Sequence, residues 1–383
     1  MHDGIVTIHD SSNWRLRVKS AGWVASGVLG TVVSSAAVAG RAYHHRIAEL
    51  RGSAAGLPNG FPAVLPPDRE YTVTADDGVE LSVEELNPAD GRAPELTVIL
   101  IHGYTLDRRC WLFQRHGLAH STAPRVRQVL YDLRSHGRSG RSPRCACTLE
   151  QLSRDLHAVI RAAAPEEGVV LIGHSLGGMI IMELAEECPE LFAERIRGVA
   201  FLNTSAGDIG RSGLPRPFLS RRNPILPLAK QRSRGGPSAR AVDRAREVCR
   251  NLVWSLTRKL AFGPEAVNPA LVELMYMMMR PISFEIMTDF LALFGTHNRY
   301  AALAGLQYAK ALVLGADCDR VIQYQHSEAI AALLPGVELV HVVGAGHMTM
   351  LEQPERVNEH LLGLISHCAG ALSSVAAELG APR

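Results

Sequence analysis

The chain has 383 residues, of which 47% are hydrophobic, and its formal net charge is +2. This length allows one large domain with an insertion, or two domains, and the apolar share is enough for a folded core. Composition and charge therefore exclude an intrinsically disordered chain, and they say little about binding partners.

The N-terminal part contains an uncharged stretch at residues 21–40, which has the length that a membrane-spanning helix needs. Small residues recur there at every fourth position, as in packed membrane helices. Ala37-Val38-Ala39 also fits a signal-peptidase site, and a weakly apolar surface helix is the third interpretation. We expect a membrane-associated or exported protein, or a cytoplasmic one if the stretch is only a surface helix.

After a linker rich in Gly and Pro at residues 52–67, short apolar runs alternate with helical patterns. Residues 71–86 alternate around Asp77-Gly78 and predict a hairpin. Thr148 is the expected N-cap of a helix that ends near residue 164. Another helix is expected to begin near Gly177. Further strands are predicted in LTVILI (96–101), in the run that begins at Arg125 and leads into a turn, and in GVVLIGHSLGG (168–178), RGVAFLNTS (197–205), AKALVLGADCD (309–319) and GVELVHVVGAGH (336–347). Later helices are predicted at about 325–334 and 354–366.

Alternation of this kind predicts an α/β fold with a mostly parallel sheet and helices on both of its faces. Residues 207–305 interrupt the pattern and predict an inserted helical lid. The expected organisation is a hydrophobic segment with its linker (1–66), a first core part (67–206), the lid (207–305), a second core part (306–368) and a tail (369–383).

The lid is expected to begin with a basic loop, since ten residues within 211–246 are Lys or Arg and only Asp243 is acidic. The basic residues are interpreted either as a solvated loop or as a patch that binds an anionic membrane surface. The loop lacks the interleaved aromatic residues that stack on bases, so no nucleic-acid partner is expected. Met- and Leu-rich helices follow and favour a hydrophobic substrate.

The sequence GHSLGG, residues 173–178, lies between a predicted buried strand and a predicted helix. A serine flanked by glycines at such a junction is typical of a nucleophile elbow, because the turn is too tight for side chains beside it. Ser175 is therefore the candidate nucleophile. A serine needs a base and an orienting acid, which follow in the order acid and then histidine.

The chain offers these partners after later strands. His347 ends the run VVGAGH, and two acids, Asp317 and Asp319, follow ALVLGA. An oxyanion hole needs backbone N–H donors, for which Tyr104 and Leu176 are the candidates. The seven cysteines show no metal-ligand spacing.

Five motifs carry a family resemblance: HGYT (102–105), DLRSHGRS (132–139), GHSLGG (173–178), DRVI (319–322) and GAGHMTMLEQPERV (344–357). In these motifs the chain resembles the α/β-hydrolase superfamily, in its lid-bearing esterase and lipase branch. The resemblance implies the triad Ser175, Asp319 and His347 and the oxyanion donors Tyr104 and Leu176. It favours Asp319 over Asp317, although Gln323 stands where the family usually has proline. It also implies structural roles for His136 and His174.

The function expected is hydrolysis of a carboxylic ester with a hydrophobic acyl or alcohol part, without a metal or organic cofactor and without an obligate protein partner. A thioesterase, perhydrolase or acyltransferase on the same triad is the alternative within the fold. A catalytically silent, membrane-tethered binding module is the alternative of another class.

Overall fold

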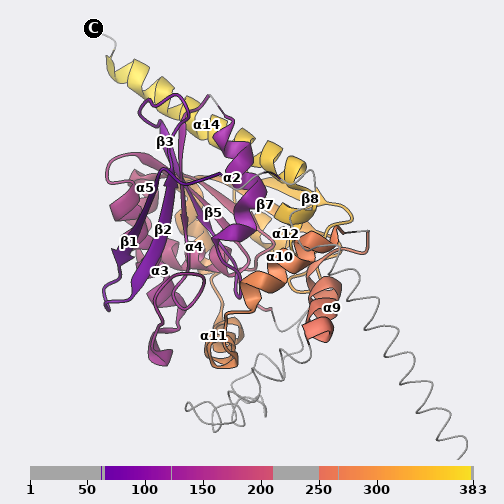
Figure 1. The fold of residues 1–383 in the computed structure, drawn as a ribbon. Coiled ribbons are helices and arrows are strands. Elements are labelled where there is room, and N and C mark those ends of the chain that lie inside the picture. The colour runs from indigo at the N-terminus through magenta and orange to yellow at the C-terminus, as the bar shows by residue number, and fades with distance from the viewer. Residues whose placement is uncertain (1–61, 63–64, 122, 210–249, 266, 381–383) are drawn as a thin grey trace, which may run out of the picture. The chain divides into compact units, whose positions relative to one another are not determined.

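The computed structural model describes residues 62, 65–121, 123–209, 250–265 and 267–380. The predicted membrane or signal segment (21–40) and the basic loop (211–246) lie outside these residues. Eight strands form one sheet in the order β1-β2-β4-β3-β5-β6-β7-β8 (Figure 1). Strands β1 (Arg69–Thr74) and β2 (Glu80–Leu86) make the predicted antiparallel hairpin, and β2 is also antiparallel to β4.

The other strands run parallel, which confirms the predicted fold class. The inner parallel strands are buried over almost their whole length because helices cover both faces of the sheet, whereas the edge strand β8 leaves Glu338, Leu339 and His341 exposed. The carboxyl ends of the parallel strands lie at one edge, so side chains that follow them come together there. The parallel strands are β3 (Leu96–Ile101), β4 (Val126–Tyr131), β5 (Gly168–His174), β6 (Ile196–Leu202), β7 (Lys310–Ala316) and β8 (Glu338–Val342).

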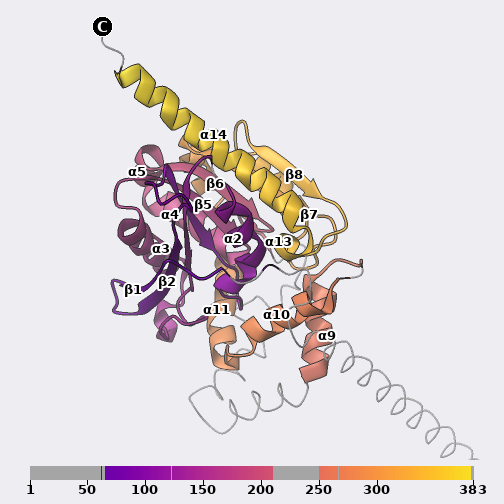
Figure 2. The same ribbon diagram turned by 45° about the horizontal axis from the view of Figure 1, so that its top comes forward.

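Helices α2 (Leu112–Ala119) and α14 (Pro354–Gly380) pack together on one face of the sheet, with α14 lying along β6 and β7 (Figure 2). Helices α3 (Leu149–Ala163) and α4 (Leu176–Glu187) pack together on the other face. The Thr148 hydroxyl accepts a 3.2 Å hydrogen bond from the Gln151 N–H, which confirms the predicted N-cap of α3. Shorter helices α5 (Pro189–Glu194), α12 (Gln325–Ala331) and α13 (Thr349–Glu352) complete the core.

Helices α9 (Arg250–Ala261), α10 (Pro269–Met279) and α11 (Phe284–Thr296) lie between β6 and β7 in the chain. They fall within the predicted insertion, and a 3₁₀ helix (Ala301–Tyr308) leads from them into β7. Contacts of α9 and α11 with loops at the carboxyl ends of the strands place these helices at the same edge as the candidate site (Figure 1).

One boundary differs from the prediction. Helix α14 continues to Gly380 rather than ending near residue 366. Residues 367–380 contain neither proline nor a charge run, and Ala and Leu are strong helix formers.

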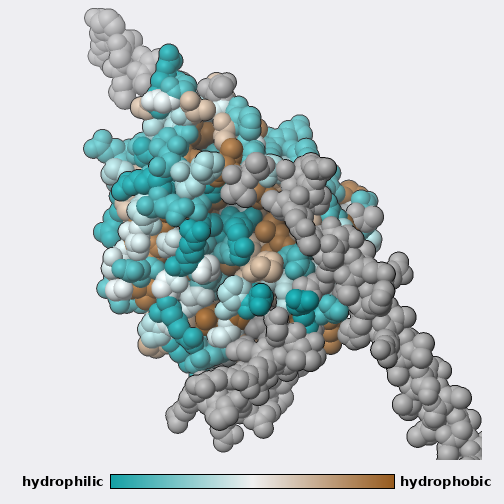
Figure 3. Space-filling model, viewed as in Figure 1, coloured by the Kyte–Doolittle hydropathy of each residue, from teal (hydrophilic) through white to brown (hydrophobic). Residues whose placement is uncertain are grey.

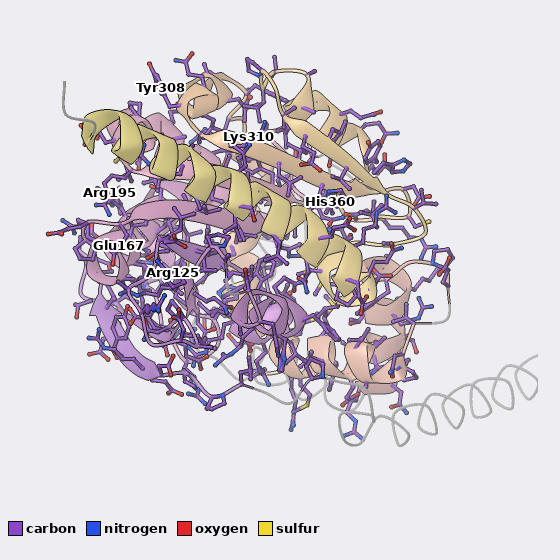
Figure 4. All side chains as sticks on the ribbon, turned by 90° about the horizontal axis from the view of Figure 1, so that it is seen from above. Arg125, Glu167, Arg195, Tyr308, Lys310 and His360 are labelled. Atoms are coloured by element: carbon purple, nitrogen blue, oxygen red, sulfur yellow. The ribbon has the colours of Figure 1, made fainter. Side chains whose placement is uncertain are left out.

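Among the described residues, no helix is both long and apolar enough to cross a bilayer. The face shown in Figure 3 is largely hydrophilic, with small hydrophobic patches between polar residues. Charged side chains also occupy the amino-terminal edge of the parallel strands, where Arg125, Glu167 and Arg195 precede β4, β5 and β6 and Lys310 begins β7 (Figure 4). Arg195 donates a 2.9 Å hydrogen bond to the Glu167 carbonyl there. This edge lies away from the candidate site.

Candidate active site

Ser175 occupies the turn between β5 and α4 with φ of 52° and ψ of −114°. Positive φ is costly for a residue with a side chain, and such strain is common at functional turns. A Cβ at Gly173 would lie 2.5 Å from the Gly178 nitrogen, and one at Gly177 would collide with the Ile101 carbonyl oxygen. The two glycines are therefore required for the close backbone approach that the sequence predicts.

His347 and Asp319 lie in the loops after β8 and β7. His347 Nδ1 is 2.7 Å from Asp319 Oδ2, and the Asp319 side chain is fully buried. The other carboxylate oxygen, Oδ1, accepts hydrogen bonds of 2.8 and 2.9 Å from the Val321 and Ile322 N–H groups. The carboxylate is thus fixed in orientation and holds one nitrogen of the imidazole ring.

Asp317, the alternative acid, points elsewhere. Its Oδ1 accepts a 2.8 Å hydrogen bond from the Gly344 N–H at an exposed position. The structure therefore brings Asp319, and not Asp317, to His347. Gly344 itself has φ of 82°, a conformation that favours glycine in this turn.

Asn203 is a site residue that the sequence interpretation did not include. It directly follows β6, is 1% exposed and has φ of 48°. Its Nδ2 donates hydrogen bonds of 3.0 Å to Asp319 Oδ2 and 3.3 Å to the Gly346 carbonyl. The signal that could have identified it is a polar residue directly after a buried parallel strand, although no motif like GHSLGG surrounds it.

The candidate oxyanion donors flank the nucleophile turn. Leu176 is the first residue of α4, where N–H groups have no partner within the helix. A Cβ at Gly103 would lie 3.2 Å from the Ser175 Cβ, so the chain just before Tyr104 passes close to the nucleophile. The Tyr104 hydroxyl donates a 2.6 Å hydrogen bond to the Met287 carbonyl of α11. The backbone beside Ser175 is thereby linked to the helices of the insertion.

Two further buried histidines, His174 and His136, form hydrogen bonds with the backbone of the loops around the site. His174 Nε2 donates a 2.9 Å hydrogen bond to the His347 carbonyl, and the two rings lie 4.8 Å apart. His136 Nε2 accepts a 3.2 Å hydrogen bond from the Thr105 N–H. Burial lowers the pKa of His136 to about 4 and that of His174 well below its ordinary value. Both rings are neutral at pH 7 and act through packing and hydrogen bonds.

Among the residues that the structure describes, no group of three or more His, Cys, Asp or Glu side chains is arranged to hold a metal ion. Two clefts, of about 500 and 420 Å³, are lined by residues other than Ser175, Asp319 and His347. The candidate site is therefore identified from the arrangement of Ser175, Asp319 and His347, and not from either of these clefts.

An eight-stranded, mostly parallel sheet with a serine on a strand–helix turn and an Asp–His pair on later loops defines an α/β hydrolase. Residues 98–360 match the family model described as "Alpha/beta hydrolase family", so the chain belongs to this family. It is a hydrolase of the α/β-hydrolase fold.

Three relatives illustrate the similarity. The chain is 25% identical to "Uncharacterized hydrolase YugF" of Bacillus subtilis, over 79% of this chain and 98% of that protein. It is 26% identical to "Probable esterase PIR7A" of rice (Oryza sativa subsp. indica), over 69% of this chain and 94% of that protein. A thermophilic esterase from Thermogutta terrifontis superposes with a TM-score of 0.61 at 23% identity, over 79% of this chain and 99% of that one.

Proposed function

We propose that the protein is a serine hydrolase that cleaves a carboxylic ester with a hydrophobic acyl or alcohol part, through an acyl-enzyme on Ser175. The observation that carries the proposal is the 2.7 Å hydrogen bond between His347 and the buried Asp319, at the same sheet edge as the strained Ser175 turn. The esterase names of the rice and Thermogutta relatives support the choice of an ester.

In the proposed reaction, Asp319 holds His347 Nδ1–H, which leaves Nε2 as the basic nitrogen of the ring. Nε2 removes the Ser175 proton as Oγ attacks the ester carbonyl. The N–H groups of Tyr104 and Leu176 stabilise the oxyanion. His347 then protonates the leaving alcohol, and water attacks the acyl-enzyme by the same route in reverse.

Helices α9, α10 and α11 are proposed as the lid over this site. The hydrogen bond from Tyr104 to Met287 supports this placement, because it joins α11 to the proposed oxyanion hole. The apolar helices α10 and α11 favour a hydrophobic substrate.

The test uses the full chain and p-nitrophenyl esters of increasing acyl length. We expect hydrolysis to be fastest with medium or long acyl groups. It should fall by about 10⁴-fold or more in Ser175→Ala, while the surface control Ser121→Ala keeps the wild-type rate. Undiminished hydrolysis by Ser175→Ala would refute the mechanism. A wild type that cleaves acyl thioesters much faster than the matching esters would favour the thioesterase alternative.

A further inference from the structure

The end of helix α9 packs directly on the loop that carries His347. The Met348 N–H donates a 3.0 Å hydrogen bond to the Ala261 carbonyl. A Cβ at Gly346 would lie 2.5 Å from the carbonyl carbon of Phe262, and a Cβ at Gly263 would collide with the Gly344 carbonyl oxygen. Two backbone segments far apart in the sequence therefore touch without a side chain between them.

Glu352, the last residue of α13, joins these two segments through its carboxylate. Oε1 accepts a 2.9 Å hydrogen bond from the N–H of Gly346, the residue before His347. Oε2 accepts a 2.7 Å hydrogen bond from the Gly263 N–H at the end of α9. Arg258 of α9 donates a 2.8 Å hydrogen bond to the Gly263 carbonyl, so both the N–H and the C=O of Gly263 are hydrogen-bonded.

The geometry requires two acceptors on one side chain. A carboxylate offers two oxygens, whereas the amide of glutamine would turn its NH₂ group toward one of the N–H donors. Burial raises the pKa of Glu352, while the hydrogen bonds from Gly263 and Gly346 oppose this shift. Burying the Glu352 carboxylate near the charge of Asp319 is unfavourable, and the hydrogen bonds from Gly263 and Gly346 offset this cost.

We propose that Glu352 is a positioning residue that ties the His347 loop to helix α9, so that the placement of the base depends on the inserted helices. Glu352 acts through the Gly346 peptide and contacts neither the substrate nor the nucleophile. This inference rests on the proposed function for its catalytic part. The coupling between the two segments is independent of any activity.

The decisive variant is Glu352→Gln, compared with Glu355→Gln, which removes an exposed carboxylate from the first turn of α14. We expect kcat of Glu352→Gln with a p-nitrophenyl ester to fall by about 10- to 100-fold, with KM changed by less than about twofold. Gly263→Ala, which disturbs the same contact from the α9 side, should have the same effect. Glu355→Gln should behave as the wild type.

Amide hydrogen exchange, followed by mass spectrometry, tests the coupling itself. In folded Glu352→Gln, peptides covering residues 343–351 and 259–265 should both exchange faster than in the wild type. Faster exchange in only one of the two peptides would overturn the coupling, and so would an unchanged kcat in the folded variant. An inactive wild type would instead refute the proposed function, and hydrogen exchange would still decide the coupling. If Glu352→Gln fails to fold, Gly263→Ala provides both measurements.

Discussion

Asn203 donates a 3.0 Å hydrogen bond from its Nδ2 to Oδ2 of Asp319. The same carboxylate oxygen also bonds His347, so the buried acid is held from two sides. The amide also reaches the Gly346 carbonyl, which joins the loops after β6, β7 and β8.

The first prediction concerns this amide. Asn203→Ala should lower kcat/KM for ester hydrolysis by about 10- to 100-fold, because a hydrogen bond to a charged group contributes about 1.5–3 kcal/mol. The matched control is Asn87→Ala, at an exposed position just after β2, which should leave kcat/KM unchanged. Wild-type kcat/KM in folded Asn203→Ala would show that the acid needs no such support.

Much of this arrangement could be predicted from the sequence, because its signals are local. Apolar runs identified the strands, and the GHSLGG motif placed Ser175 on a strand–helix turn. The family resemblance favoured Asp319 over Asp317, but position alone could not separate the two acids, because they follow the same strand two residues apart. Only the three-dimensional structure shows that Asp319 bonds His347 while Asp317 bonds Gly344.

Other features depend on contacts between distant segments. The bond from Gly263 to Glu352 joins residues 89 positions apart, and no local pattern predicts it. The position of Asn203 directly after β6 is a local signal, but its contact with Asp319, 116 residues away, is not predicted by any local pattern. The end of α14 was placed too early, since helix formers without a stop signal define no boundary.

The second prediction concerns the nucleophile turn. In Gly177→Ala, the new methyl group would meet the Ile101 carbonyl oxygen of the central strand β3. Because the strand backbone cannot move away cheaply, we expect a loss of about 1–3 kcal/mol in the free energy of unfolding and no measurable labelling of Ser175. Gly363→Ala, in α14, is the control, since nothing lies within 4 Å of its added Cβ. That variant should be as stable as the wild type or up to about 1 kcal/mol more stable in urea titrations.

The third prediction concerns pH. Burial lowers the pKa of His102 to about 4 and that of His136 to about 4, from 6.5. Between these values the unfolded chain binds more protons than the folded protein, so each ring makes stability fall as the pH drops from 6.5 toward 4. At pH 5 each ring should cost about 2 kcal/mol relative to pH 7.

Carboxylates with raised pKa values act in the opposite direction, so the test compares wild type with His136→Asn. Urea titrations near pH 7 and pH 5 should show a loss of stability that is about 2 kcal/mol smaller in the variant. An equal loss in the two proteins would mean that His136 titrates normally in the folded state.

The fourth prediction concerns a buried ion pair away from the reacting groups. Arg134 is fully buried, and its Nε and Nη2 each bond Asp155 at 2.6 Å. Asp155→Ala leaves this guanidinium partly unpaired and should lower the free energy of unfolding by about 3–5 kcal/mol. The exposed Asp90→Ala serves as control and should change it by less than about 0.5 kcal/mol. Labelling of Ser175 in the folded fraction should keep its wild-type rate, and a slower rate would assign Arg134 a role in the site.

The proposed triad is tested most directly by covalent labelling with a fluorophosphonate, followed by intact mass and by mapping of the modified residue. We predict one adduct, on Ser175, that is absent in Ser175→Ala and forms about 10²- to 10⁴-fold more slowly in Asp319→Asn. Asp317→Asn should label at the wild-type rate, because its carboxylate bonds the Gly344 peptide and not His347. Labelling of another residue, or equal rates in Asp319→Asn and the wild type, would contradict the assignment of Ser175, His347 and Asp319.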